Sequence, residues 1–325
     1  MASPLVQELG ASLRLPVIGS PMFILSNPKL VLAQCTSGIM GAFPALNARP
    51  AELLAQWLQE IEDGLAEWRQ ANPGRAAAPY AVNQIIHPSN DRLEADLQTC
   101  ARFKVPYVIT SLRAPQEVVG TIHAWGGRVF HDVTTVRHAE KALEAGVDGL
   151  ILVCAGAGGH AGTLSPFALV EEVRRFYDGP VVLAGAISTG RGILAARAMG
   201  ADLVYLGTRF IASQEANASE TYKRMVVDAR AADILHTPTF TGIPGNYLVP
   251  SIRAAGLDPA QLPPPAETGA VFGSGHARAW RDIWGAGQGV GAVDAVEPAS
   301  RIIERLAAEY GAALKTLASA EEIPG

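Results

Sequence analysis

The sequence predicts an α/β protein built as a (β/α)8 barrel, the TIM barrel. Short apolar runs alternate with longer stretches of helical periodicity along most of the chain. Several of these runs are almost continuous in Val, Ile and Leu, as is typical of parallel strands covered on both faces. Eight such units in roughly 230 residues match the number and length that a barrel requires.

The eight predicted strands leave room for a helix between most neighbours. They are Pro16–Ser20, Ile39–Phe43, Tyr80–Gln84, Pro106–Thr110, Arg128–Asp132, Gly149–Val153, Pro180–Ala184 and Asp202–Leu206. The predicted helices include Ala51–Gln70, Asp91–Phe103, Thr135–Glu144, Pro166–Tyr177 and Gly190–Ala198. Gly126, Gly146 and Gly200 precede strands, as glycines that end a helix do. An open doubly wound sheet is the competing architecture, but its Gly-rich loop would follow the first strand rather than late ones.

The regular alternation ends after the eighth unit. Between Ile234 and Gly275 prolines are too dense for a long helix or a central strand. We expect this segment to form a lid over the barrel mouth, with Phe240 or Tyr247 at the substrate cavity; a peripheral excursion over the outer helices is the alternative. Helical patterns resume at His276–Ile283 and Pro298–Leu317. The predicted parts are a cofactor-binding barrel core at 1–233, a lid-like insertion at 234–275 and a C-terminal helical segment at 276–325 packed on the barrel.

Composition limits the classes of function. The 325 residues are 49% hydrophobic and 18% charged, which is ample for a large core. A net charge of −5 gives no reason to expect a nucleic acid or a membrane as partner. Cys35, Cys100 and Cys154 are far apart and have neither metal-site nor disulfide spacing. The N-terminus lacks the pattern of a signal peptide, so we expect a cytoplasmic protein without a metal. The sequence allows a homodimer without defining one.

The loop after the predicted strand Gly149–Val153 carries a single titratable side chain among glycines. It reads Gly158-Gly159-His160-Ala161-Gly162. Glycine lets a backbone approach a flat ligand, and histidine exchanges protons near neutral pH. His160 is therefore the candidate catalytic residue. A mobile turn with an incidental histidine is the alternative interpretation.

The loops after the last two predicted strands are candidates for binding a phosphate. The seventh strand ends in Ala184-Gly185-Ala186 and the eighth in Gly207-Thr208, each just before a helix. In a barrel these loops commonly bind phosphate through backbone N–H groups. Ordinary βα turn chemistry is the alternative for either loop alone.

Other candidates lie at the ends of earlier strands and near the C-terminus. Pro21-Met22 follows the first strand and either faces the site or packs in the core. Asn83 ends the third strand and could hydrogen-bond a planar heterocycle, although Asn is also common in turns. His131-Asp132 ends the fifth strand and is either a rival base or a structural contact. Gln288 lies between glycines, which suits close approach to a ligand.

Taken together, these residues resemble the nitronate monooxygenase family (formerly 2-nitropropane dioxygenases), flavoproteins with an FMN-binding barrel. The resemblance covers most of the chain. It rests on Pro21-Met22, Asn83, the Gly158–Gly162 loop, Ala184–Ala186, Gly207–Phe210 and Ala286–Gln288. It implies that His160 is the catalytic base and that Ala184, Gly185, Ala186, Gly207 and Thr208 hold the FMN phosphate. It implies isoalloxazine contacts from Met22, Asn83 and Gly159, and we add Pro21 and Gln288 as cofactor-binding residues.

Two positions depart from the family pattern. Gly19-Ser20 precedes Pro21-Met22 where many relatives have Gln-Ala or Gln-Gly. Asp132 stands where some relatives carry a lysine near the flavin.

The resemblance implies an FMN-dependent enzyme that converts an alkyl nitronate and O2 to a carbonyl compound and nitrite. His160 would either remove the proton α to the nitro group or bind the nitronate anion. An NAD(P)H-dependent flavin reductase of quinones or enoyl thioesters is the alternative on the same platform. A barrel that binds a phosphorylated ligand without catalysis is the third hypothesis.

Overall fold

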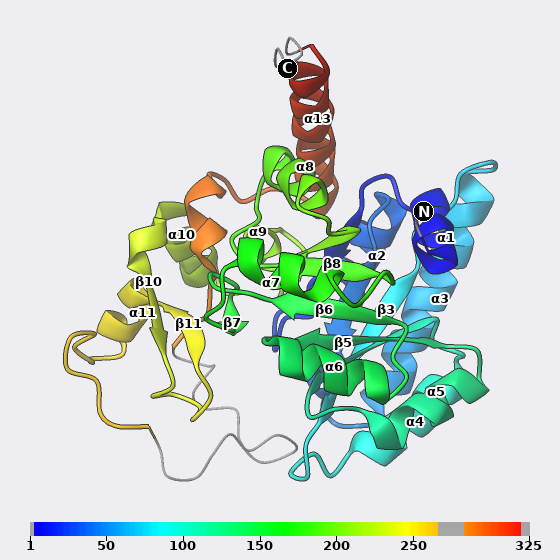
Figure 1. Ribbon diagram of the computed structural model, residues 1–325, viewed down its shortest axis with the longest axis horizontal. Coiled ribbons are helices and arrows are strands. Elements are labelled where there is room, and N and C mark those ends of the chain that lie inside the picture. The colour runs from blue at the N-terminus through cyan, green and yellow to red at the C-terminus, as the bar shows by residue number, and fades with distance from the viewer. Residues whose placement is uncertain (1–2, 266–282, 320–325) are drawn as a thin grey trace.

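Eight parallel strands form a nearly closed barrel in the computed structural model, which describes residues 3–265 and 283–319 (Figure 1). The strands are β1 (Val17–Gly19), β2 (Gly41–Pro44), β3 (Tyr80–Ile86), β4 (Tyr107–Leu112), β5 (Arg128–Val133), β6 (Gly149–Val153), β8 (Val181–Ala184) and β9 (Leu203–Leu206). Their order in the sheet is β1-β9-β8-β6-β5-β4-β3-β2. Ile18 of β1 bridges Met40 in parallel just before β2, and the N–H of Gly19 donates to the carbonyl of Met40 at 2.7 Å. The barrel that the sequence predicted is confirmed.

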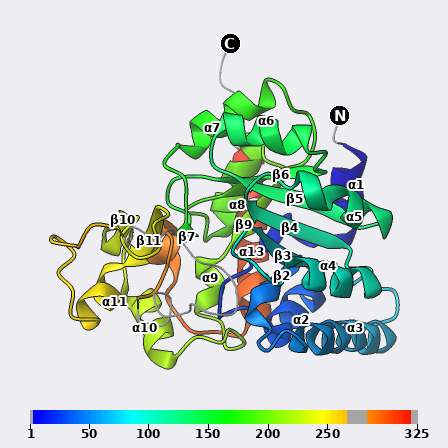
Figure 2. The ribbon, with the colours of Figure 1, turned by 90° about the horizontal axis from the view of Figure 1, so that it is seen from below.

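Helices cover the outside of the barrel (Figure 2). They are α1 (Pro4–Ser12), α2 (Pro28–Thr36), α3 (Leu53–Ala71), α4 (Leu93–Arg102), α5 (Gln116–Ala124), α6 (Val136–Glu144), α7 (Pro166–Arg174), α8 (Gly190–Ala198), α9 (Thr208–Ile211), α10 (Glu220–Asp228), α11 (Val249–Ala254) and α13 (Ala299–Ala318). Short 3-10 helices lie at η1 (Ala45–Asn47), η2 (Ala231–Asp233) and η3 (Gln288–Ala292). Figure 2 shows α2 and α3 on one side of the strands and α6 and α7 on the opposite side.

The apolar strands are explained by burial on both faces. All five residues of β6 are buried. Leu150 and Leu152 pack outward with the cluster beneath the helices, whereas Ile151 packs in the barrel interior. Leu9 of α1 belongs to the same interior cluster, so the N-terminal helix helps to fill the barrel. A strand with apolar neighbours on both sides needs no polar face, which is why the runs read as nearly continuous Val, Ile and Leu.

A second, three-stranded sheet stands beside the barrel. It consists of β10 (Ile234–Thr237), β11 (Gly245–Leu248) and β7 (Gly159–His160), with both pairings antiparallel. With α10 and α11 it forms the group at the left of Figure 1. The segment predicted as a lid thus contains a short hairpin and the six-residue helix α11, in line with its proline density. Its residues 266–275 lie outside the described part of the chain.

The C-terminal segment follows the sequence prediction in its second half. Helix α13 matches the pattern expected at Pro298–Leu317, packs against α8 and α2, and extends beyond the body of the molecule (Figure 1). Of the helix expected at His276–Ile283, only Ile283 is among the described residues, so that prediction is not tested. The division of the chain into 1–233, 234–275 and 276–325 also stays a prediction.

Candidate active site

A cavity of about 1170 Å³ opens where the carboxyl ends of the barrel strands meet the second sheet. Small-molecule sites commonly measure about 300–1,000 Å³, so this one has room for a planar cofactor and a substrate together. Ten of the residues singled out from the sequence line it: Pro21, Met22, Asn83, Gly159, His160, Ala184, Gly185, Ala186, Gly207 and Thr208. Gln288 is exposed and is not among the lining residues.

Two glycine-rich loops form one wall by direct contact of their backbones. A Cβ on Gly158 would lie 2.8 Å from the nitrogen of Gly287, and one on Gly287 would lie 2.5 Å from the carbonyl oxygen of Gly156. The N–H of Gln288 donates to that same carbonyl at 2.8 Å. Glycine is required here because no side chain fits between the two backbones. Gln288 thus contributes its main chain to the wall, while its contact with a ligand stays a prediction.

His160 lies half-buried at this wall, in a defined hydrogen bond. Its Nε2 is 2.9 Å from Oγ1 of Thr241, and the hydroxyl of Thr241 in turn donates to the carbonyl of Ile243 at 3.1 Å. With the hydroxyl proton used in that way, Thr241 accepts from Nε2–H, which assigns the lone pair of the neutral ring to Nδ1. Burial lowers the pKa of His160 to about 4, so the imidazole is uncharged at neutral pH.

The second sheet holds the His160 loop in place. Gly245 pairs with His160, and the N–H of Ala161 donates to the carbonyl of Pro244 at 3.2 Å. The side-chain amide of Asn246 donates to the carbonyl of Ala157 at 2.6 Å. The sequence analysis missed both Thr241 and Asn246, because they lie in the segment read as loop and no local pattern marks them.

The two aromatic residues expected at the cavity take different places. Phe240 lines the cavity together with Thr241, Ile243 and Pro244. Tyr247 is fully buried behind it, with the two ring centroids 4.9 Å apart in an edge-on contact. The described part of the segment 234–275 therefore borders the cavity.

The rival bases at the end of β5 point in different directions. His131 is buried away from the cavity, where Nδ1 lies 2.8 Å from the hydroxyl of Thr110 and burial lowers its pKa to about 4. Asp132 lines the cavity. The hydroxyl of Ser111 donates to Asp132 Oδ2 at 2.7 Å, and the amide of Asn83 donates to the same hydroxyl at 2.8 Å. Asn83, Ser111 and Asp132 thus form a polar row from β3, β4 and β5.

The loop after β8 differs from the expected helix-end cradle. The N–H of Gly190 at the start of α8 donates to Oε2 of Glu309 at 2.8 Å, and that of Gly192 donates to Thr189 Oγ1 at 3.1 Å. Protein groups already satisfy these donors, so they are not available to an anion. Ser188 remains: it lines the cavity, and its buried hydroxyl makes no hydrogen bond with any described residue. A phosphate site in this structure would use the loop before α8 together with Gly207 and Thr208.

The loop after β1 is positioned by Asn47, which sequence reasoning also missed. The N–H of Ile24 donates to Oδ1 of Asn47 at 2.8 Å. The side-chain amide nitrogen of Asn47 donates to the carbonyls of Met22 and Ser26 at 2.9 and 2.8 Å. These three bonds fix the turn that presents Met22 to the cavity.

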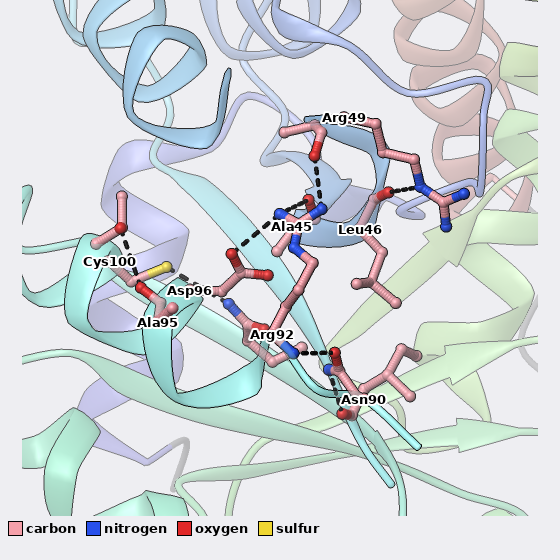
Figure 3. A network of polar contacts seen from close by, with 12 residues as sticks. Ala45, Leu46, Arg49, Asn90, Arg92, Ala95, Asp96 and Cys100 are labelled. Atoms are coloured by element: carbon pink, nitrogen blue, oxygen red, sulfur yellow. Dashed lines mark hydrogen bonds and ion pairs between the residues drawn. The ribbon is translucent and has the colours of Figure 1, made fainter. Parts of the chain in front are cut away.

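A polar network around Arg92 holds η1, the short helix that carries Asn47 (Figure 3). Its guanidinium donates to the carbonyls of Ala48 and Ala45 at 2.7 and 3.3 Å and pairs with Asp96 at 3.0 Å. The network ties η1 to the start of α4. It thereby supports Leu46 and Arg49, which line the cavity.

Metal-binding clusters and membrane-spanning helices are both absent from the described residues. No group of three or more His, Cys, Asp or Glu in that part of the chain is placed to hold a metal ion. No helix among those residues combines the length and apolar character needed to cross a bilayer.

Comparison with known proteins gives one consistent family. A sequence profile described as nitronate monooxygenase matches residues 42–309. A protein named nitronate monooxygenase from Paraburkholderia phytofirmans is 27% identical over 303 residues, which cover 81% of each chain. The structure of a nitroalkane oxidase from Streptomyces ansochromogenes superposes with a TM-score of 0.75 at 26% identity, covering 95% of this chain and 99% of the other. FabK from Thermotoga maritima superposes with a TM-score of 0.74 at 25% identity, covering 98% and 99%.

We predict that His160 titrates far below an ordinary histidine. Nuclear magnetic resonance of the ring nitrogens should give a midpoint near pH 4, with the Nε2–H tautomer above it, because burial disfavours the charged ring. Thr241→Val should keep the low midpoint but mix the two tautomers, since Nε2–H loses its acceptor. Thr163→Val, the same change on an exposed threonine of the cavity rim, should alter neither. A midpoint near pH 6.5 in the unaltered protein would contradict the burial argument.

Proposed function

Because this chain belongs to the nitronate monooxygenase family and is an oxidoreductase of that family, we propose that it binds FMN in the barrel cavity and converts alkyl nitronates and O2 to carbonyl compounds and nitrite. The observation that carries the proposal is the neutral imidazole of His160, held by a hydrogen bond at the wall of a cavity large enough for cofactor and substrate.

The lining residues fit FMN. The unpartnered Ser188 hydroxyl, with Gly207 and Thr208, would hold the phosphate, and the polar and apolar groups of Asn83, Met22 and Pro21 would face the ring system. Ala184, Gly185, Ala186 and Gly159 are small enough to let a flat ligand lie against the backbone. The described lining offers one such cradle for a phosphate, which favours a mononucleotide over a dinucleotide. When bound, FMN supplies the electron chemistry of the reaction.

His160 would supply the proton chemistry. A neutral imidazole can accept the proton α to the nitro group of a neutral nitroalkane. A nitronate has already lost that proton, so the ring of His160 would position the nitronate and would not act as a base. Phe240, Thr241, Ile243 and Pro244 would limit the access of water to the reacting atoms. We place the protein in the cytoplasm, where its three buried free cysteines are compatible with a reducing milieu.

The likeness to FabK over nearly the whole chain supports a second candidate, an NAD(P)H-dependent reductase of quinones or enoyl thioesters. An anaerobic titration of the purified protein separates the two. We expect an alkyl nitronate alone to bleach the bound flavin, and NADH or NADPH to leave it oxidised. Bleaching by the reduced nicotinamide but not by nitronate would select the reductase. A colourless protein that takes up no flavin would favour a barrel without catalysis.

The cofactor site is tested best at Gly207. A Cβ there would lie 3.4 Å from Cβ of Ser20 and 3.8 Å from Cγ of Met22, in ordinary contact, and φ of −106° suits any residue. Gly207→Val should therefore fold normally but lose FMN, because its methyl groups enter the cavity. Heat denaturation of the unaltered protein should release FMN and not FAD. Gly120→Val on the exposed face of α5, where a Cβ meets nothing within 4 Å, is the control and should retain the flavin.

Gly185, a glycine of the other predicted phosphate loop, is a poorer test than Gly207. A Cβ there would lie 2.8 Å from the carbonyl oxygen of Ala155, and φ is +134°. Substitution would strain the backbone whether or not a phosphate binds.

The role of His160 can be measured with two substrates. His160→Asn should keep the flavin and lower turnover of a neutral nitroalkane by about 10²–10⁴-fold, the usual contribution of a positioned base. Turnover of the pre-formed nitronate should fall less, because its proton is already gone. An equal loss on both substrates would make His160 an anion-binding residue, and full activity on both would remove it from the mechanism.

A further inference from the structure

Asp132 lines the cavity from the end of β5 and carries one side-chain oxygen that nothing in the described structure satisfies. Its Oδ2 accepts from Ser111, but Oδ1 is buried within the protein and makes no hydrogen bond with any described residue. A buried ionised oxygen without a partner is costly, whereas a protonated carboxyl group carries no charge.

We propose that Asp132 holds a proton on Oδ1, and that loss of this proton places a negative charge in the wall of the cavity beside the bound flavin. The proposal rests on the proposed binding of FMN, and it adds a residue whose charge responds to the state of the cofactor. Ser111 already occupies Oδ2, so Oδ1 is left to carry the proton.

The electrostatics of the site support a neutral carboxyl group. Burial raises the pKa of Asp132 to about 7, and the hydrogen bond from Ser111 acts in the opposite direction. Near neutral pH a small change in surroundings therefore decides whether the proton stays. A flavin that gains negative charge on reduction would favour the protonated form.

Five other titratable residues line the same cavity. Tyr205 on β9 and Tyr222 on α10 stay neutral, because burial raises the pKa of each far above the usual value, and the nearby charge of Asp132 adds to this effect at Tyr205. His160 on β7 is neutral for the reason given above. Arg49 keeps its positive charge near neutral pH, although burial lowers its pKa. His138 on α6 is exposed and lies 3.0 Å from the hydroxyl of Thr134, so it serves as the control.

The experiment compares Asp132→Asn with the unaltered holoenzyme in two measurements. Infrared spectroscopy should show the carbonyl band of a protonated carboxyl group that disappears as the pH rises through about 7 and is absent in the variant. The reduction potentials of the two flavins should coincide well below pH 7 and separate above it. The unaltered protein should then have the lower potential, because its ionised carboxylate disfavours negative charge on the flavin.

Matched variants identify the group. Ser111→Ala removes the bond that stabilises the ionised carboxylate, so the band should persist to higher pH. His138→Gln and Asp63→Asn, the latter on the exposed face of α3, should leave both readouts unchanged. If His138→Gln changes the infrared band or the pH dependence of the flavin potential, the assignment of these signals to Asp132 is wrong.

Two further results would also overturn the proposal. If no carboxyl band is lost in Asp132→Asn, Asp132 is ionised throughout and carries no proton. If the carboxyl band titrates but the two reduction potentials differ equally at every pH, ionisation of Asp132 does not act on the flavin. Neither measurement uses a nitronate, so a failure of the proposed reaction would leave both intact. If the protein binds no FMN, the infrared titration still reports on Asp132, while the proposed cofactor fails separately.

Discussion

The site depends on the antiparallel pairing of β7 with β11. This pairing joins the loop after β6 to a segment more than eighty residues further along the chain, and it involves only two residues of each strand. So short a ladder cannot hold itself, because each strand fixes its backbone for very few hydrogen bonds. Asn246 and Thr241 add side-chain bonds to Ala157 and His160, and the glycine contacts with the 285–289 loop close the other side. The position of the imidazole is therefore set by the fold and not by its own loop.

Desolvation gives the cavity its chemical character. Withdrawal from water disfavours charge, so it lowers the pKa of His160 and raises that of Asp132, and both groups tend to be neutral near pH 7. An anionic substrate would then meet hydrogen-bond donors and apolar surface where an ionised carboxylate would have repelled it. Arg49 is the lining residue, among those described, with a permanent positive charge. The neutral groups on β5 and β7 are suited to handling protons.

The sequence was sufficient for the barrel and for the glycine-rich loops of the cavity, and the reason is physical. Strands buried on both faces read as apolar runs, and glycines forced by backbone contact read as glycine-rich loops, so both signals are local. Thr241, Asn246 and Asn47 carry no such signal, because each acts through a bond to a distant part of the chain. The capping of α8 by Glu309 was hidden for the same reason: its partner Gly190 lies 119 residues earlier. Asp132 was visible as a departure from the family pattern, but only the unpartnered Oδ1 gives that departure a chemical meaning.

The hydrogen bond between Thr241 and His160 links access to the cavity with the state of the imidazole. Thr241 belongs to the segment that borders the cavity, and it receives the Nε2–H of His160. Moving that segment away from the barrel would break this bond and the ladder between β7 and β11 at once, and it would expose the ring to water. A hydrated imidazole returns toward its ordinary pKa of about 6.5 and exchanges tautomers freely. While the segment is seated, burial keeps the ring uncharged and the hydrogen bond to Thr241 fixes its orientation, so exclusion of water and orientation of the imidazole are the same structural event.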